Sequence, residues 1–225
     1  MIKKINELST RLITALIFGI LFWGIFLFLP PRVTSIGLLT ILIIILLGEW
    51  PTFLSHNNRF LWLLTPLYPI LPFILLIILN ENSTTRPLLY YLFGMVFIHD
   101  TASYVVGNLI GTKKIMPSVS PGKSWQGFFG GFLATCCALQ ITLWEFKLTR
   151  PFFSILTVSF AVCAISLGGD FFESWLKRRA NIKDSGSLLP GHGGFLDRFD
   201  GVLFTAFFFY IYRYHLVPLL LGYVI

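Results

Sequence analysis

The sequence predicts an all-α, polytopic transmembrane bundle of about seven spans with a cytosolic N terminus, and three observations favour this fold class. The residues AVILMFWYC make up 56% of the 225 residues, only 12% are charged, and mean hydropathy is +0.79. Soluble domains reach roughly 45–50% apolar residues with glycine counted, and about 25% charged residues. Several apolar runs also approach the roughly 20 residues that cross a bilayer. A soluble globule of this composition would expose too much apolar surface.

The first apolar run follows Lys3, Lys4 and Arg11 and begins like a signal peptide. It continues without a small-residue cleavage site, so we expect a retained first span. Runs such as LLTILIIILL lack the alternation of membrane β-strands, which favours helices. Short charged segments separate the runs, and no long linker divides the chain, so we expect one integral membrane domain over residues 1–225. The expected spans are 12–30, 34–48, 60–79, 87–111, 126–144, 152–176 and 201–225.

The third run contains Pro66, Pro69 and Pro72, so we expect a kinked or re-entrant helix there. Seven spans with a cytosolic N terminus place twelve Lys and Arg residues on the cytosolic side. The opposite side then holds Arg32, Arg86, Lys147 and Arg150. This imbalance supports the orientation through the positive-inside rule.

The net charge of +7 does not indicate a nucleic-acid partner, because the cations are spread over loops between apolar runs. The three cysteines all lie within apolar runs, which favours packing over disulfides or metal binding. Composition thus excludes several classes of function without selecting one.

All five aspartates lie between positions 100 and 200. Asp100 lies inside an apolar run, where an acid is costly and usually marks a site; the alternative is a helix that ends there, at a water-filled rim. Asp170 and Glu173 are three residues apart and share a helical face, as do Asp197 and Asp200. In the expected topology, both pairs lie at the cytosolic side.

The segment between these pairs, LKRRANIKDSGSLLPGHGG, carries four basic residues and a glycine cluster. A solvated positive-inside loop would account for the basic residues but not for the flanking acids. Carboxylates suit magnesium, and cations with glycine-exposed N–H groups bind phosphates. The combination therefore predicts a metal–phosphate site.

A second polar segment, KKIMPSVSPGKSWQGFFGG, spans residues 113–131. Its GKS resembles a phosphate loop, but that motif needs glycine where this chain has Pro117. We expect a turn whose hydroxyls and lysine bind phosphate, or a helix N-cap at Ser120 or Ser124, and both roles are compatible. Gly127 and Gly131 form a small-xxx-small step that favours helix packing.

The stretch from Ser174 to Asp200 resembles the signature of the phosphatidate cytidylyltransferases, also called CDP-diacylglycerol synthases. Residues 169–173 resemble the lead-in to that signature, residues 100–104 its D-T-x-A-Y element, and residues 120–127 its SP-x-K-[ST]-W-E-G element. Gln126 stands where the family has glutamate. The resemblance covers about residues 100–201, is weak over 1–99, and leaves 202–225 as a last transmembrane helix.

The resemblance implies condensation of phosphatidic acid with CTP to CDP-diacylglycerol and pyrophosphate, with magnesium, by a homodimer. We expect Asp170, Asp197 and Asp200 to hold magnesium, with Asp100 as a further ligand or neighbouring acid. Lys177 and Arg178 complete the expected catalytic group. The residues expected to bind substrate phosphates are Ser120, Lys123, Ser124, Lys183, His192, Gly193, Gly194 and Arg198.

Two alternative functions for the acidic residues are a CDP-alcohol phosphotransferase and an ion-coupled transporter. A CDP-alcohol phosphotransferase also uses clustered aspartates and magnesium, but its usual aspartate motif is absent here. An ion-coupled transporter would use Asp100 and Asp170 in an ion path but leaves the glycine-rich loop and the basic cluster unexplained. The short chain without a targeting extension favours a bacterial inner membrane, with the active site facing the cytosol.

Overall fold

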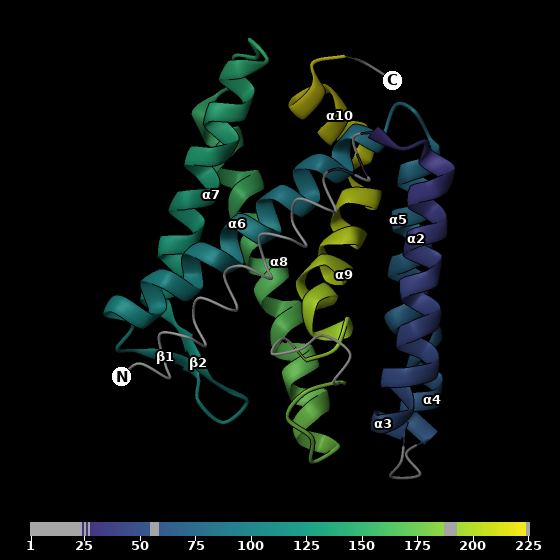
Figure 1. The fold of residues 1–225 in the computed structure, drawn as a ribbon. Coiled ribbons are helices and arrows are strands. Elements are labelled where there is room, and N and C mark those ends of the chain that lie inside the picture. Colours follow the sequence, from purple (N-terminus) through teal and green to yellow (C-terminus); the bar gives the residue numbers. More distant parts are fainter. Residues whose placement is uncertain (1–23, 25, 27, 55–58, 187–192, 224–225) are drawn as a thin grey trace.

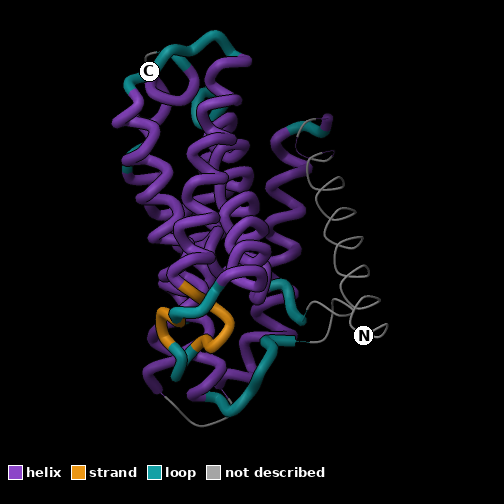
Figure 2. Tube along the Cα trace, turned by 90° about the vertical axis from the view of Figure 1, so that its left-hand side faces the viewer, coloured by secondary structure: helices purple, strands orange, loops and turns teal. Residues whose placement is uncertain are grey.

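The fold is that of a computed structural model, which describes residues 24, 26, 28–54, 59–186 and 193–223. In this part of the chain the protein is mostly helical, with one short β-hairpin at one end of the helices (Figure 2). The α-helices are α2 (Pro31–Ile44), α3 (Trp50–Leu54), α4 (Arg59–Leu64), α5 (Leu71–Glu81), α6 (Arg86–Ile110), α7 (Trp125–Glu145), α8 (Phe152–Arg179), α9 (Leu196–Ile211) and α10 (Arg213–Leu221).

Four helical stretches of the described chain are long and apolar enough to cross a membrane. They are Pro31–Phe53, Trp62–Glu81, Trp125–Glu145 and Phe152–Arg179, and the α9–α10 pair makes a fifth if a bent pair counts as one span. The chain is therefore an integral membrane protein. The seven expected spans are not all recovered, since most of 12–30 lies outside the described residues and α6 is not among the four.

Two π-helical turns interrupt the N-terminal helices. Ile45–Glu49 joins α2 to α3, and Pro66–Ile70 precedes α5. Within the second turn Tyr68 has extended backbone angles (φ −154°, ψ 117°) next to Pro69, which confirms the expected kink. The first turn ends at a buried glutamate, Glu49, whose partners are described below.

Helix α6 crosses the molecule diagonally between the α2–α5 pair and α7 (Figure 1). Its buried residues include Leu88, Leu92 and Val96, and from α9 the core receives Leu203 and Phe209. At its far end α6 packs closely on α7, because Gly131 faces His99 and Ser103 without a side chain between them. This confirms the packing role expected for Gly131.

The turn expected in the polar segment 113–131 is a β-hairpin. Strands β1 (Lys114–Met116) and β2 (Ser120–Ser124) pair antiparallel with an irregular register. Ser124 then caps α7, with its hydroxyl accepting the N–H of Gly127 at 3.2 Å. The all-α prediction was therefore wrong for this short segment, while the expected N-cap is confirmed at Ser124.

The expected last helix, 202–225, is also wrong as a single element. Helices α9 and α10 meet at an angle of 93° at Tyr212. Arg213 donates to the carbonyl of Tyr210 at 2.5 Å, which satisfies a backbone group at the break.

At the end of the bundle opposite the hairpin, two arginines bind backbone carbonyls. Arg86 donates to the carbonyls of Phe26 and Leu29 at 2.8 and 2.9 Å. Arg150 donates to those of Pro218 and Leu219, both at 2.7 Å. Both side chains thus tie neighbouring segments together at this end.

Candidate active site

Helix α8 ends and α9 begins at the end of the bundle that carries the hairpin (Figure 1). Several predicted site residues lie on these helix ends, namely Asp170, Lys177, Asp197 and Asp200. Helices α8 and α9 cross closely there because Gly169 and Gly201 lie in the crossing. A Cβ on Gly169 would lie 3.1 Å from the Cβ of Phe204, and one on Gly201 would lie 3.3 Å from Oδ1 of Asp170. The crossing therefore brings Asp170 of α8 beside the first turns of α9, where Asp200 lies.

Asp170 forms an ion pair with Lys123 of β2. The carboxylate side chain is 9% exposed and the lysine side chain 31%. Burial lowers the pKa of the Lys123 ammonium, whereas Asp100, Asp200 and Glu173 raise it. The hairpin thus places the Lys123 ammonium near acids of α6, α8 and α9.

Lys177 bridges two acids in the same region. Its ammonium donates to Oε2 of Glu173 at 3.0 Å and to Oδ1 of Asp197 at 2.7 Å. Glu173 is fully buried, and its Oε1 has no hydrogen-bond partner among the described residues. The hydroxyl of Tyr68 is also buried without a partner there, and it lies close enough to Glu173 to interact electrostatically.

Asp197 is held by a dense set of donors in addition to Lys177. Its Oδ2 accepts the backbone N–H of Ser185 at 3.0 Å, the Ser185 hydroxyl at 2.9 Å and the N–H of Gly194 at 2.8 Å. Gly193 has φ +80°, and a Cβ there would meet the Asp197 carboxylate. These contacts fix the loop before α9 around one carboxylate.

The cytidylyltransferase family model matches residues 12–216. The chain belongs to the cytidylyltransferase family. Three relatives are named phosphatidate cytidylyltransferase. That of Haemophilus influenzae is 37% identical over 172 residues, 69% of this chain and 59% of that protein. That of Bacillus subtilis is 37% identical over 122 residues, which are 54% of this chain and 45% of that protein. That of Rickettsia bellii is 32% identical over 211 residues, which are 91% of this chain and 90% of that protein. The matched part thus spans less than two thirds of the first two relatives.

Within this cytidylyltransferase chain, the predicted acids do not form one ligand group. Asp170 and Asp200 lie at the α8–α9 crossing, and Asp100 of α6 interacts electrostatically with Lys123, Asp200 and Arg198. Asp197 instead faces Lys177, Ser185 and Gly194. Among the residues that the structure describes, no three His, Cys, Asp or Glu side chains converge as metal ligands.

The predicted phosphate-binding residues of the cytidylyltransferase chain fall in different surroundings. Ser120 is half-buried in β2, Ser124 is buried as the cap of α7, and Lys183 is exposed after α8. Arg178 is exposed and its Nε donates to the carbonyl of Val119 in the hairpin turn at 3.3 Å. Arg198 is exposed in the first turn of α9, and His192 lies outside the described residues.

Gln126, the departure from the family pattern, links the start of α7 to the residues before β1. Its Oε1 accepts the N–H of Lys113 at 3.2 Å and its Nε2 donates to Thr112 at 2.7 Å. A glutamate could still accept the Lys113 N–H and the Thr112 hydroxyl proton, so these two contacts suit either residue, and the amide differs in carrying no charge. Gln126 therefore links the two segments at the base of the hairpin without adding a negative charge there.

Sequence analysis missed Glu49 and Ser185 in this family member. Glu49 is buried in the N-terminal half, yet it contacts the loop before α9. Its signal was an isolated acid near the end of an apolar run, the same signal that drew attention to Asp100. Ser185 is one small polar residue among several in its loop, and nothing local marks it.

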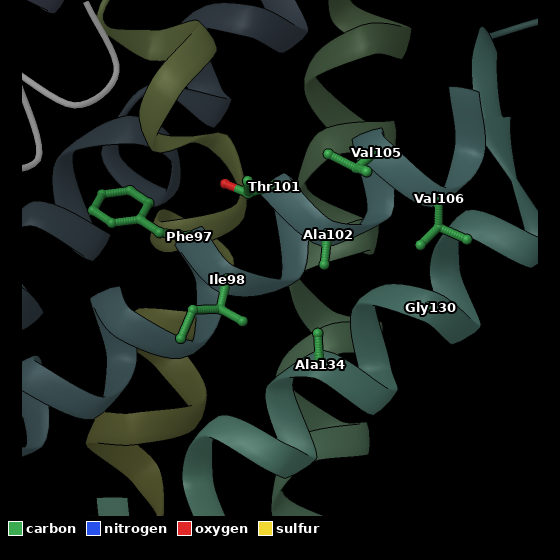
Figure 3. Close-up of a pocket in the computed structure, with 8 residues that line it drawn as sticks. All are labelled: Phe97, Ile98, Thr101, Ala102, Val105, Val106, Gly130 and Ala134. Carbon is green, nitrogen blue, oxygen red and sulfur yellow. The ribbon is translucent and has the colours of Figure 1, made fainter. Parts of the chain in front are cut away.

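A separate groove of about 510 Å³ lies between α6 and α7 (Figure 3). Phe97, Ile98 and Val105 of α6 and Ala134 of α7 are among its mainly apolar lining. The lining residues of this groove include no charged side chain.

Proposed function

We propose that this chain is a magnesium-dependent phosphatidate cytidylyltransferase of a bacterial inner membrane. It would condense phosphatidic acid with CTP to give CDP-diacylglycerol and pyrophosphate. The observation that carries the proposal is the meeting of the Lys123–Asp170 and Lys177–Asp197 pairs with buried Glu173 at one end of the helices. The name shared by the relatives from Haemophilus influenzae and Rickettsia bellii, phosphatidate cytidylyltransferase, supports the same reaction.

In this reaction an oxygen of the lipid phosphate attacks the α-phosphorus of CTP. A new P–O bond forms, the bond from the α-phosphorus to the bridging oxygen of the β-phosphate breaks, and pyrophosphate leaves with that electron pair. The nucleophile is already ionised, so the reaction needs alignment and charge neutralisation more than a general base. Lys123 is the more exposed partner of its ion pair, which supports a role for it in contacting a phosphate oxygen.

The residues of the site fit a divalent cation. Five acids interact there, namely Asp100, Asp170, Glu173, Asp197 and Asp200, against Lys123, Lys177 and Arg198. The surplus of carboxylates and the unpartnered Oε1 of Glu173 favour a bound cation, and magnesium prefers oxygen ligands together with substrate phosphates. Asp170 and Asp200, with Asp100 beside them, would hold it, and magnesium would supply neutralisation of phosphate charge.

Asp197 was expected to be a magnesium ligand, but we propose that it orients Lys177 instead. Both of its oxygens already accept hydrogen bonds, which is typical of a carboxylate that orients its neighbours. It would hold Lys177 against the phosphates. We further propose that the hairpin end faces the cytosol, where CTP is found, and that the protein acts as a homodimer.

The direct test uses purified protein in detergent with phosphatidic acid, radiolabelled CTP and magnesium. We expect label in the lipid fraction with equimolar pyrophosphate, and loss of both products when magnesium is chelated. A parallel reaction with CDP-diacylglycerol and an alcohol detects a phosphotransferase through CMP release. Product only in that second reaction would overturn the proposal.

A further inference from the structure

Glu49 is the single acidic residue of the helical stretch Pro31–Phe53, and its side chain is buried at 1% exposure. It ends the π-helical turn Ile45–Glu49, a type of irregularity that often occurs at functional sites. A buried carboxylate is costly unless donors surround it. The identity of those donors therefore indicates what the residue does.

Among the described residues, the donors bonded to the Glu49 carboxylate all come from a segment more than 130 positions later in the chain. Oε1 accepts the N–H of Phe195 at 2.6 Å, and Oε2 accepts the N–H of Leu196 at 2.8 Å and the Ser185 hydroxyl at 3.1 Å. The N-cap residue of α9, Phe195, provides no side-chain cap of its own. Glu49 thus caps α9 from another helix, where a negative charge is stabilised by the helix dipole.

The same contacts lead to Asp197. Ser185 lies between the two carboxylates, since its hydroxyl is also 2.9 Å from Oδ2 of Asp197. Gly194, which donates its N–H to Asp197, lies against Glu49, and a Cβ there would be 2.6 Å from Cδ of Glu49. The hydroxyl has one proton to share, but each carboxylate also has backbone donors. Any shift of Glu49 therefore moves the groups that hold Asp197.

We infer that Glu49 is a positioning residue for the transfer reaction. It fixes the start of α9 and, through Ser185 and Gly194, sets the orientation of Asp197 and hence of Lys177. This inference rests on the proposed function, because Lys177 matters only if a phosphate lies against it. The N-terminal helices then contribute to the reaction without touching a substrate.

The test compares Glu49→Gln with a matched control, Glu81→Gln. Glu81 also accepts a serine hydroxyl between two helices, from Ser35 at 2.6 Å, but it is exposed. In Glu49→Gln an NH2 group faces one of the two backbone N–H groups, so one of the two capping bonds and the negative charge are lost. We expect kcat to fall by about tenfold to a hundredfold, the cost of roughly 1 Å misplacement, with KM for both substrates nearly unchanged. Glu81→Gln should keep the wild-type kcat and KM.

Ser185→Ala and the double variant show whether Glu49 acts through this route. Ser185→Ala should lower kcat as well, and the double variant should lose less than the product of the two single effects. If Glu49→Gln does not fold, the kcat of Ser185→Ala alone tests the inference. A wild-type kcat in Glu49→Gln, independent effects in the double variant, or a wild-type kcat in Ser185→Ala would overturn the inference.

Amide hydrogen exchange separates this inference from the proposed function. Exchange at 193–197 should rise in Glu49→Gln and not in Glu81→Gln, whichever reaction the protein catalyses. If the wild type makes no CDP-diacylglycerol, the proposed function fails while the exchange result still reports on the cap. Unchanged exchange in Glu49→Gln would contradict the cap itself.

Discussion

The ion pair between Lys123 and Asp170 joins a partly exposed hairpin residue to a buried helix residue. Because the lysine side chain is 31% exposed and the carboxylate 9%, the lysine is the partner that can turn toward an arriving phosphate. Asp170 would then be released to neighbouring cations. Under the proposed function, the pair would exchange partners when substrate binds.

Replacing Lys123 with alanine should weaken substrate use. The cation that meets the phosphate is removed, and Asp170 loses its partner, so we expect the KM for CTP to rise about tenfold or more, as for loss of one charged contact. Lys123→Arg should retain part of the affinity. Initial rates over a range of CTP and phosphatidic acid concentrations measure this, and unchanged KM values for both substrates would remove Lys123 from the phosphates.

Asp200→Asn should abolish turnover while the protein stays folded. The carboxylate lies at the α8–α9 crossing, and its loss should cost at least about a hundredfold in rate, as for removal of a main electrostatic group. Asp184→Asn is the control, since Asp184 is exposed in the nearby loop. Rates at several magnesium concentrations, with melting temperature in detergent, distinguish a metal defect from unfolding. A near-normal rate in Asp200→Asn would exclude it from the metal.

Site residues could be predicted from the sequence where a charged residue flanks an apolar run. Asp170, Lys123 and Lys177 stand out as charges flanking apolar runs, and the structure brings them together. The partners of Asp197 could not be derived, because they include backbone N–H groups whose direction depends on the fold. Glu49 could not be assigned a role because its partners are far away in sequence.

At the scale of the elements, the close crossing of α8 and α9 depends on Gly169. The neighbouring Gly168 provides a matched control for a substitution at Gly169. A Cβ on Gly169 would collide with the Asp200 carbonyl, whereas one on Gly168 would meet nothing within 4 Å. Gly169→Ala should therefore push the helices apart, separate Asp170 from Asp200 and reduce the rate about tenfold or more. Gly168→Ala should keep the rate and raise stability by up to about 1 kcal/mol through helix propensity. Activity and melting temperature of the two variants check this, and equal rates would contradict it.

The helix ends were harder to predict than the helices. The segment Ser120–Ser124 reads SPGKS, which has no alternation to indicate a strand. The break at Tyr212 lies inside a continuous apolar run, where Arg213 is the only charged residue, so hydropathy alone joins α9 to α10. Both features come from tertiary contacts that local patterns do not record.

For the whole molecule, the orientation in the membrane is testable with a single cysteine at an exposed loop position. Lys183→Cys, in a variant with Cys136, Cys137 and Cys163 replaced, places a thiol at the hairpin end. We expect a membrane-impermeant maleimide to label it in inside-out vesicles and not in intact spheroplasts. The reverse pattern would place the site on the outer face.

The two arginines at the other end of the bundle hold the protein's own backbone. Arg86 and Arg150 donate to main-chain oxygens, so both guanidinium groups are already engaged within the protein. At the hairpin end Arg179 and Lys183 are exposed to their surroundings. Under the proposed function, these two exposed cations would be available to anionic headgroups and nucleotides near the site.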